Sequence, residues 1–577
     1  MTIEYTSPYG ISSFEDFNKL NKAFVDKTEF INVIDKLDSP YPVLLRPRRF
    51  GKTTFVQMLL CFYDISFKDK YDEIFKGTKI LEMNLPSHNS YHVIKFDFSG
   101  ISGTNVESLI TNFNQKVSVG INDFLIRYPD FEFSNDYTGR DPANFIDEFF
   151  KTFARYSKSK SLYILIDEYD NFANDVLSND RDLFKTITQS NGFLKDFYKT
   201  IKTFTNTVVA KTFITGVSSV SLDSLTSGFN IAENVTCDPN LNEFAGFTKD
   251  ELIGLIEKLV DTKALNTTAE NIAEIMRQAY NGYAFCPKAK HTLFNSSMCL
   301  NYIKYINTNQ ALQNPERVLD PACAFDKSKV ADIISFTPKN VLKLVASEFE
   351  STGEIVISEL AQSINLNQID QYDLQTSLSV LYYLGYLTIK NDGVGSRICL
   401  TYPNKMMKYM FELCFINALI PKLEDDDNCI FDITSMLRGD NSLDSFIDSV
   451  TEYLSLRITN QHLLGFNENT IKVLVRAKLE DLKMLSVNTE QKLTVPMVGE
   501  KFADLVVDNR KGTYYLFEFK YFSKAKAQQH PNILQEKIAE VTAQINSYKT
   551  AVEFEGKTVF SYIAIFESIN CVHFERL

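Results

Sequence analysis

The stretch Leu44–Thr54, with the sequence LLRPRRFGKTT, decides the fold of the first part of this chain. It ends in the tripeptide Gly-Lys-Thr (51–53), which is typical of a phosphate-binding loop. Apolar residues over 41–45 predict a strand before the loop, and apolar residues at helical spacing over 54–63 predict a helix after it. In this setting, backbone N–H groups at the helix start face the phosphates of a nucleotide.

Within this loop, Lys52 is expected to reach the β- and γ-phosphates, and the Thr53 hydroxyl is expected to hold Mg²⁺. Arg46 stands at the first position, where the usual pattern has glycine. The three arginines add charge and bulk, so the alternative interpretation is a basic turn that begins a core helix. The residues expected to bind nucleotide are Arg46, Pro47, Arg48, Arg49, Phe50, Gly51, Lys52, Thr53 and Thr54.

A second strand, expected over 162–166, ends in two acidic residues. Its continuous apolar character predicts burial on both faces, as in a parallel sheet. Asp167 is expected to join the Mg²⁺ ligands, and Glu168 is expected to polarise the attacking water. The alternative is a core strand that ends in a solvated acidic turn. The Gly-Lys-Thr loop upstream favours the ATPase interpretation.

Two further strands are expected at 91–98 and 208–215. Thr215 or Ser218, at the end of the later strand, could sense the γ-phosphate, although a serine or threonine there is more often a helix cap. Because strands alternate with helices, the expected fold class is α/β, with a parallel sheet covered on both faces.

Helix starts flank this core. Asp26 and Thr28 are expected to cap the helix that follows them. Thr248, followed by acidic residues, predicts the first helix of a helical lid over 247–310.

These segments resemble the AAA-ATPase-like family of predicted P-loop ATPases. The resemblance covers about residues 10–305, and Arg46 at the first loop position is typical of the family. It implies ATP and Mg²⁺ as cofactors, and a C-terminal PD-(D/E)xK nuclease domain commonly follows. The matching strings are FVDKT at 24–28, RPRRFGK at 46–52, IDEYD at 166–170, GFT at 246–248, YNGYAF at 280–285 and FN at 294–295.

Residues 355–404 carry a separate pattern, typical of a winged helix. One helix is expected to begin at 357–361 and a second to span 374–384; strands are expected at 385–390 and 397–401, joined by a turn at 391–393. The functional interpretation is DNA contact. The expected recognition helix has almost no Arg or Lys, its polar residues being Gln375, Thr376 and Ser377, so a structural or interaction wing is favoured. The acidic run 425–427 predicts a linker.

Residues 440–577 hold a second candidate site. Strands are expected at 502–507 and 513–519, joined by a three-residue loop with Gly512 in a left-handed conformation. This register places Asp504 directly across from Glu518, with Lys520 on the same face. Two carboxylates can hold a divalent cation that activates water against a phosphodiester, and a lysine can stabilise the developing charge.

The spacing Asp-x13-Glu-Phe-Lys resembles the PD-(D/E)xK nucleases. A helix expected over 531–549 carries Gln544 and Tyr548 four residues apart, as in some of these nucleases. Glu468 stands where the first acidic residue of these nucleases would. Phe502-Ala503 replaces the Gly-Arg often found before the aspartate. The alternative interpretation is an exposed hairpin with ordinary salt bridges.

The expected catalytic residues are Glu168, Glu468, Asp504, Glu518, Lys520, Gln544 and Tyr548. The expected metal ligands are Thr53, Asp167, Asp504 and Glu518.

The composition of the chain limits which ligands and partners can be expected. The net charge of −13 does not favour a protein that coats nucleic acid, so such contact needs a local patch. Residues 501–549 hold eight Lys or Arg against five Asp or Glu, a mild basic patch. Nine scattered cysteines argue for a reducing compartment and against a zinc site. Without a signal pattern or a long apolar run, a soluble cytoplasmic protein with no membrane contact is expected.

Four domains are expected: a P-loop AAA-type ATPase at 1–240, a helical lid at 241–345, a winged-helix-like segment at 346–430, and a restriction-endonuclease-like α/β domain at 440–577. The expected function is ATP binding and hydrolysis coupled to a Mg²⁺-dependent nuclease that acts on nucleic acid through the C-terminal domain. The first alternative is a nucleotide-switch signalling or scaffold ATPase with an inactive nuclease fold. The second is a DNA-binding regulator that uses the wing. A homo-oligomer or a protein partner is left open.

Overall fold

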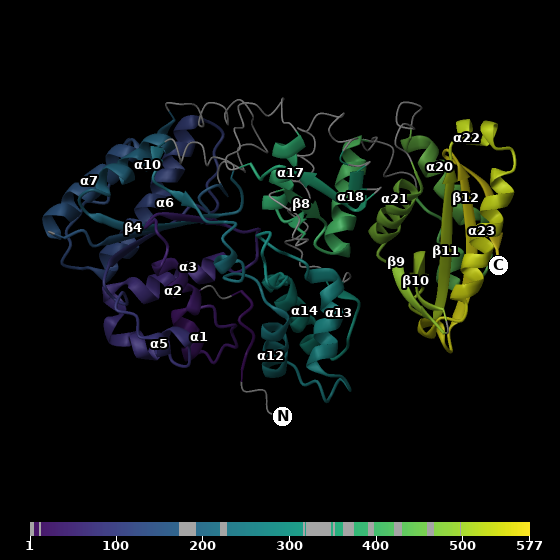
Figure 1. Ribbon diagram of the computed structural model, residues 1–577, viewed down its shortest axis with the longest axis horizontal. Coiled ribbons are helices and arrows are strands. Elements are labelled where there is room, and N and C mark those ends of the chain that lie inside the picture. Colours follow the sequence, from purple (N-terminus) through teal and green to yellow (C-terminus); the bar gives the residue numbers. More distant parts are fainter. Residues whose placement is uncertain are drawn as a thin grey trace. The chain divides into compact units, whose positions relative to one another are not determined.

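The computed structural model divides into two compact units, Met1–Lys408 and Tyr409–Leu577 (Figure 1). The first unit holds the segments expected as ATPase and lid and most of the winged-helix-like segment. The structure describes residues 5–10, 13–157, 159–171, 192–219, 228–315, 318, 345, 348–349, 352–361, 374–390, 397–419, 430–458, 467–496 and 498–577.

A five-stranded sheet of order β2-β3-β4-β1-β5 organises the first unit. Its neighbouring strands pair in parallel, which confirms the predicted α/β class with a parallel sheet. Because β1, β4 and β3 lie next to one another and run in the same direction, the loop strand β1 and the acidic strand β3 have their carboxyl ends at the same edge of the sheet. The strands are β1 Pro42–Leu45, β2 His92–Asp97, β3 Leu162–Asp167, β4 Val209–Gly216 and β5 Glu233–Asn234.

Helices cover both faces of this sheet, because its central strands carry apolar side chains on both faces. Every residue of β1 and β3 is buried, as their continuous apolar character predicts. α6, α7 and α10 lie on one side of β4 in Figure 1, with α2 and α3 on the other. The helices are α1 Glu15–Lys19, α2 Glu29–Asp35, α3 Lys52–Tyr63, α4 Tyr71–Ile74, α5 Lys79–Met83, α6 Val106–Arg127, α7 Pro142–Tyr156 and α10 Phe193–Phe204, with the 3₁₀ helices η1 Ile65–Lys70 and η2 Pro239–Leu241.

Asp26 and Thr28 cap a different helix from the one predicted. The Asp26 carboxylate accepts the backbone N–H of Lys79 at 2.8 Å, and the Thr28 hydroxyl accepts that of Ile80 at 3.2 Å. These are the first N–H groups of α5, so the two side chains complete α5 and not α2. The prediction that they cap α2 was wrong, because both side chains reach a helix that is distant in sequence, Asp26 bonding to a residue 53 positions away.

Three helices make up the segment expected as the lid: α12 Lys249–Leu259, α13 Ala269–Tyr280 and α14 Ser296–Asn309. Thr248 and Glu251 form a capping box at the start of α12, in agreement with the predicted helix start.

A three-stranded antiparallel sheet of order β6-β8-β7 follows. The predicted helix start at 357–361 is wrong, because Ile357 ends β6 and 358–361 lie outside any helix; residues 362–373, into which the helix was expected to continue, lie outside the described residues. The turn 391–393 and the linker 425–427 fall outside the described residues. The elements are β6 Glu354–Ile357, α17 Leu374–Tyr383, β7 Thr388–Ile389, β8 Ile398–Thr401 and α18 Lys405–Leu419.

The second unit is built on a five-stranded sheet of order β13-β12-β11-β10-β9, mixed because only β11 and β12 pair in parallel. One face packs on α20 and α21, and the other packs on α23. The strands are β9 Ser486–Val495, β10 Gly499–Asp508, β11 Thr513–Phe522, β12 Thr558–Glu567 and β13 Asn570–Arg576. The helices are α19 Thr434–Arg438, α20 Asp444–Arg457, α21 Glu468–Asp481, α22 Lys524–Gln529, α23 Ile533–Tyr548 and the 3₁₀ helix η7 Val552–Phe554.

The β10–β11 hairpin has the predicted register. Asn509 donates its N–H to the Thr513 carbonyl at 3.1 Å, which closes a loop of three residues. Gly512, the last of them, has φ +91°, a conformation that favours glycine. Leu505 therefore pairs with Phe517, and the next pair toward the site is Asp504 with Glu518.

Candidate functional site

The loop between β1 and α3 turns its carbonyls toward the lid. Phe50 accepts the Gly246 N–H at 2.8 Å and the Ser296 hydroxyl at 3.2 Å, while Arg49 accepts the Ser297 N–H at 3.2 Å. These bonds hold the Arg49–Phe50 side of the loop, called its outer side below, against the lid. The start of α3, whose first N–H groups lack intrahelical acceptors, is the part of the loop suited to an anion.

Lys52 lies between this loop and the acidic strand. Its side chain is buried, and Nζ donates to the Pro47 carbonyl at 3.2 Å. The same Nζ lies 3.9 Å from Glu168 Oε1. The loop cation and the acidic end of β3 therefore face the same space, as expected for a lysine that binds phosphate next to a hydrolytic acid.

Asp167 and Thr53, the two expected Mg²⁺ ligands, meet at this edge. Burial raises the pKa of Asp167, and the neighbouring Lys52 and Thr53 side chains lower it. Among the described residues, Asp167 Oδ2 is a buried atom without a hydrogen-bond partner. An unpaired buried carboxylate oxygen beside a hydroxyl is a suitable donor set for Mg²⁺.

Glu168 has strained backbone geometry. Its φ of +53° lies in the left-handed region, which is costly for a residue with a Cβ. The N–H of Glu168 donates to Asp167 Oδ1 at 3.0 Å. Burial raises the pKa of Glu168, and Lys52 opposes that rise. Such strain clusters at functional sites, where the surrounding structure holds it.

Arg46, expected among the nucleotide contacts, is a structural residue. Its guanidinium is buried and donates to the carbonyls of Leu45, Thr236 and Leu241 at 2.8, 2.9 and 2.7 Å. It also stacks 4.2 Å from the centre of the Phe285 ring, and its N–H donates to a β4 carbonyl. Burial lowers the pKa of Arg46 to about 10. Through Nη1 and Nη2, Arg46 fastens the loop to the segment before the lid, while its Nε is a buried atom without a hydrogen-bond partner among the described residues.

Two other loop residues contact neighbouring segments. Arg48 donates to the Asn171 side chain at 3.0 Å. Pro47 packs so closely on Gly385, at the end of α17, that a Cβ at Gly385 would lie 2.9 Å from the proline Cβ. The loop is thus enclosed by protein on its outer side.

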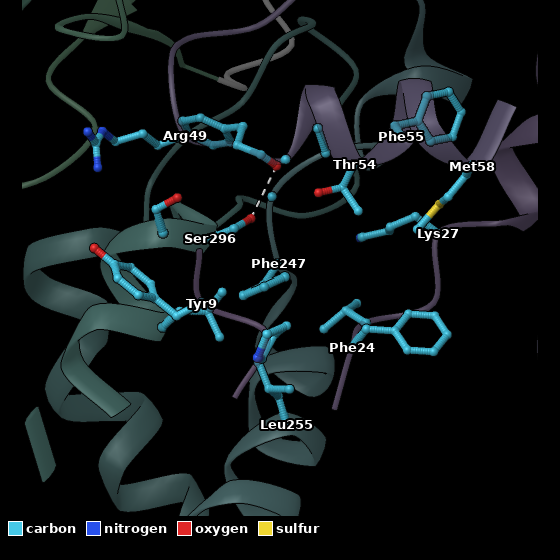
Figure 2. Close-up of a pocket in the computed structure, with 18 of the residues that line it drawn as sticks. Tyr9, Phe24, Lys27, Arg49, Thr54, Phe55, Met58, Phe247, Leu255 and Ser296 are labelled. Atoms are coloured by element: carbon cyan, nitrogen blue, oxygen red, sulfur yellow. Dashed lines mark hydrogen bonds between the residues drawn. The ribbon is translucent and has the colours of Figure 1, made fainter. Parts of the chain in front are cut away.

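A cavity of about 340 Å³ opens beside the loop at Gly51 and Thr54 (Figure 2). Its walls come from the N-terminal segment, from α3 and from the lid. Most of its lining is apolar, with Phe17, Phe24, Phe55, Met58, Phe247, Leu255 and Leu300. Sequence reasoning missed this cavity, although Phe24 and Phe247 each belong to a quoted family string.

The two candidate sensors, Thr215 and Ser218, have structural partners. The Thr215 hydroxyl donates to the Leu44 carbonyl at 2.6 Å. The N–H and hydroxyl of Ser218 both donate to Asp170 Oδ2, at 2.8 and 2.9 Å. Asp170, the last residue of the IDEYD string, therefore holds the end of β4 beside the end of β3.

In the second unit, Asp504 and Glu518 lie side by side, as predicted. The Asp504 N–H donates to Glu518 Oε1 at 3.1 Å, and the Phe519 N–H donates to Asp504 Oδ2 at 2.9 Å. Glu468, the first residue of α21, joins them through an ion pair of 3.2 Å with Lys520. The structure thus brings all four predicted charged residues together.

Lys472 is a member of this group that sequence reasoning missed. Its Nζ lies 3.0 Å from Asp504 Oδ1 and 3.6 Å from Glu468 Oε1. The available signal was its position four residues after Glu468, on the same face of α21.

Gln544 and Tyr548 hold α23 against the same strand. The Gln544 amide donates to the Tyr548 hydroxyl at 2.6 Å, and this hydroxyl donates to the Phe502 carbonyl at 2.9 Å. Burial raises the pKa of Tyr548. The pair therefore fixes the backbone two residues before Asp504.

The carboxylates of this group fit a divalent cation in part. Burial and the neighbouring Asp504 raise the pKa of Glu518 to about 9. Among the described residues, Glu518 Oε2 is buried without a hydrogen-bond partner, so it is open to a cation. Across the same residues, however, no group of three or more His, Cys, Asp and Glu side chains is arranged to hold a metal. Both Asp504 oxygens already have partners: Oδ1 lies 3.0 Å from the Lys472 amine, and Oδ2 accepts the Phe519 N–H.

Comparison with known proteins concerns the first unit above all. Residues 8–226 match the family model described as Predicted AAA-ATPase. This match agrees with the loop, the acidic strand and the parallel sheet, and it supports ATP binding by this part of the chain. It does not extend to the β10–β11 site.

More distant similarities cover more of the chain. A protein described as "Uncharacterized protein in vnfD 5'region", from Azotobacter chroococcum mcd 1, is 22% identical over 427 residues, which are 72% of this chain and 70% of the relative. The Walker-type ATPase paby2304 of Pyrococcus abyssi has a TM-score of 0.36 at 12% identity, over 67% of this chain and 96% of that chain. A structure of Drosophila ORC bound to DNA has a TM-score of 0.28 at 12% identity, over 71% and 94%. The two structural similarities are too distant to define function here.

Among the helices of the described residues, none combines the length and the apolar character needed to cross a membrane.

Proposed function

We propose that the first unit binds ATP with Mg²⁺ and hydrolyses it, and that the second unit is a metal-dependent nuclease coupled to this ATPase. The observation that carries the ATPase is the meeting of Lys52, Glu168 and the unpaired Asp167 oxygen at one sheet edge. The match of residues 8–226 to the Predicted AAA-ATPase model supports the same conclusion.

In this proposal the phosphates lie at the start of α3, and the nucleoside half lies in the cavity beside Gly51 and Thr54. The volume of about 340 Å³ is within the range of small-molecule sites. Aromatic and aliphatic walls suit the flat, apolar faces of a base. Lys52 would exchange the Pro47 carbonyl for phosphate oxygens.

Thr53 and Asp167 would hold Mg²⁺, which would neutralise charge on the phosphates when bound. Glu168 is placed to orient and polarise the attacking water. Its raised pKa, caused by burial, makes it a better proton acceptor than an exposed glutamate, provided that it is ionised. Asp170 keeps the ends of β3 and β4 together and supports the geometry without contacting nucleotide.

For the nuclease, Asp504 and Glu518 would hold a divalent cation that activates water. Lys520 would stabilise charge on the phosphodiester, and Glu468 would orient Lys520. Tyr548 and Gln544 would keep β10 in position. The register, the shared face and the basic patch over 501–549 support this assignment.

A second candidate function is a nucleotide-switch ATPase whose nuclease fold does not cleave. The observation that favours it is the ion pair between Lys472 and Asp504, which fills one ligand position with an internal cation. Such a protein would bind nucleotide and signal to a protein partner.

The test uses the full chain with ATP and with Mg²⁺ or Mn²⁺. Wild type, Lys52→Ala and Asp504→Ala are compared for ATP binding by calorimetry, for phosphate release, and for cleavage of a panel of DNA and RNA. We expect Lys52→Ala to lose ATP binding and Asp504→Ala to lose cleavage. ATP turnover without metal-dependent cleavage by wild type would favour the switch.

A further inference from the structure

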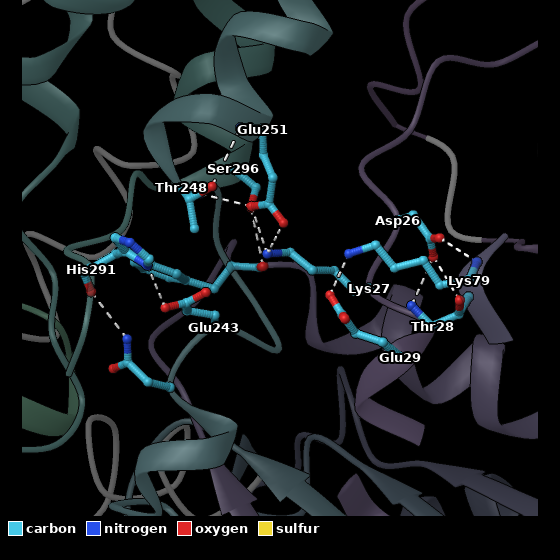
Figure 3. Close-up of polar contacts among 12 residues, drawn as sticks. Asp26, Lys27, Thr28, Glu29, Lys79, Glu243, Thr248, Glu251, His291 and Ser296 are labelled. Atoms are coloured by element: carbon cyan, nitrogen blue, oxygen red, sulfur yellow. Dashed lines mark hydrogen bonds and ion pairs between the residues drawn. The ribbon is translucent and has the colours of Figure 1, made fainter. Parts of the chain in front are cut away.

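Lys27, in the FVDKT string, links the N-terminal segment to the lid (Figure 3). Its Nζ lies 2.7 Å from both carboxylate oxygens of Glu251, in the first turn of α12. Lys27 is only 6% exposed and the Glu251 side chain is 25% exposed, so the lysine end of the pair is buried and the carboxylate end is partly in water. A partly buried ion pair is costly to break on one side, because one charge is then left without a partner.

Both ends of this link are fixed. On the lid side, Glu251 Oε2 also accepts the Thr248 N–H at 2.8 Å, which closes the capping box of α12. On the other side, Asp26 and Thr28 hold the chain around Lys27 by capping α5. The ion pair therefore joins two positioned backbones and not two loose side chains.

The same residues border the cavity beside the phosphate-binding loop. Lys27 and its neighbour Phe24 line one wall, while Phe247 and Leu255, four residues on from Glu251, line the wall that the lid supplies (Figure 2). The Lys27–Glu251 pair thus lies where these two walls meet. The pair is a direct link between the segment that carries Phe24 and the helix that carries Leu255.

We propose that Lys27 and Glu251 are positioning residues for the nucleoside half of the bound nucleotide. They hold the Phe24 and Phe247 walls at the distance at which a base fits between N-terminal segment and lid. This inference rests on the proposed nucleotide function of the first unit. It assigns to FVDKT a role separate from that of the loop, which holds the phosphates through Lys52.

The division of roles can be measured by comparing ATP with inorganic tripolyphosphate, which lacks the nucleoside. For Lys27→Met in the full chain, we expect KM for ATP to rise about tenfold or more, equivalent to about 1.4 kcal/mol, with kcat at saturating ATP unchanged. Calorimetry should show the same loss of ATP affinity and an unchanged affinity for tripolyphosphate. Lys52→Ala should weaken binding of both ligands.

A matched control is Lys79→Met. Lys79 pairs with Glu29 at 2.6 Å beside the same segment, but this pair is solvent-exposed and outside the cavity lining. Lys79→Met should therefore leave the affinities for ATP and for tripolyphosphate unchanged. The double variant Lys27→Met/Glu251→Met removes both charges, avoids an unpaired, partly buried carboxylate, and should show the same rise in KM if Lys27→Met alone does not fold.

The outcomes separate the inference from the function on which it rests. If wild type binds neither ATP nor tripolyphosphate, the nucleotide function is wrong, and this inference with it. If wild type binds ATP and the folded Lys27→Met and double variants bind it equally well, the inference alone is wrong. A parallel loss of ATP and tripolyphosphate in these variants would also overturn it, because the pair would then act on the whole site.

Discussion

Lys52 Nζ lies 3.9 Å from Glu168 Oε1, so the loop lysine and the acid of the neighbouring strand face each other across the edge of the parallel sheet. The two residues belong to different strand–loop units, and the insertion of β4 between β1 and β3 brings these units into line. In the proposed function, this relationship places the phosphate-binding lysine and the hydrolytic acid in a single site.

Glu168→Gln should separate binding from hydrolysis. The amide keeps the shape of the side chain and loses the proton acceptor, so we expect ATP affinity to remain and turnover to fall by about 10²-fold or more. Calorimetry and phosphate release measure the two quantities. Lys151→Ala, which breaks an exposed pair with Asp147, is the control. Wild-type turnover in Glu168→Gln would show that Glu168 does not act on the water.

Arg46→Gly, which restores the usual first residue of the loop, should destabilise the protein. It removes a buried guanidinium that donates to three carbonyls, and we expect a loss of about 3 kcal/mol or more in the free energy of unfolding. Urea unfolding followed by circular dichroism measures it. Arg46→Lys keeps the charge but loses the forked set of donors, so its free energy of unfolding should lie between those of wild type and Arg46→Gly. A glycine variant as stable as wild type would contradict the structural role of Arg46.

Asp504→Ala and Lys520→Ala should abolish nucleic-acid cleavage and leave ATP turnover close to wild type. The reason is that, in the proposed nuclease, a metal-activated water would need no nucleotide for bond breaking. ATP turnover and cleavage are measured on the same preparations. If correctly folded Asp504→Ala lost ATP turnover, the two groups would form one composite site.

Lys472→Met should bind a divalent cation more tightly than wild type. The lysine amine lies 3.0 Å from Asp504 Oδ1 and would compete with a cation for that oxygen, and its removal also takes away a repulsive charge. Titration with Ca²⁺ in a calorimeter measures the affinity without any cleavage. Lys537→Met, which removes a partly exposed lysine paired with Glu540 on α23, is the control. Weaker cation binding in Lys472→Met would show that the amine supports this site.

Glu518 should make stability depend on pH. Its folded-state pKa of about 9 lies above the ordinary 4.5 because of burial and Asp504, so the folded protein retains a proton that the unfolded chain releases. The stabilising contribution is complete below about pH 4.5 and is lost as pH rises toward about 9. Glu518→Gln carries no such proton and should be the more stable protein at alkaline pH. Urea unfolding of both proteins across this range is the measurement, and parallel curves would contradict the raised pKa.

Much of the fold follows from local sequence. Strands with continuous apolar residues, such as 162–166, are recognisable because burial on both faces leaves no polar positions. The register that pairs Asp504 with Glu518 follows from a loop of three residues ending in Gly512, since side chains alternate strictly along a strand. In both cases the physical cause lies within about 15 residues of the effect.

The sequence by itself determined the phosphate-binding loop, the acidic strand end and the carboxylate hairpin, because short-range periodicity and turn geometry specify them. Tertiary structure alone decided that Arg46 faces carbonyls, that Asp26 caps α5, that Lys472 pairs with Asp504, and that Lys27 reaches Glu251 beside the cavity. The partners in these contacts lie 32 to 224 positions apart. Which buried charge meets which acceptor depends on how the elements pack, and no local pattern encodes it.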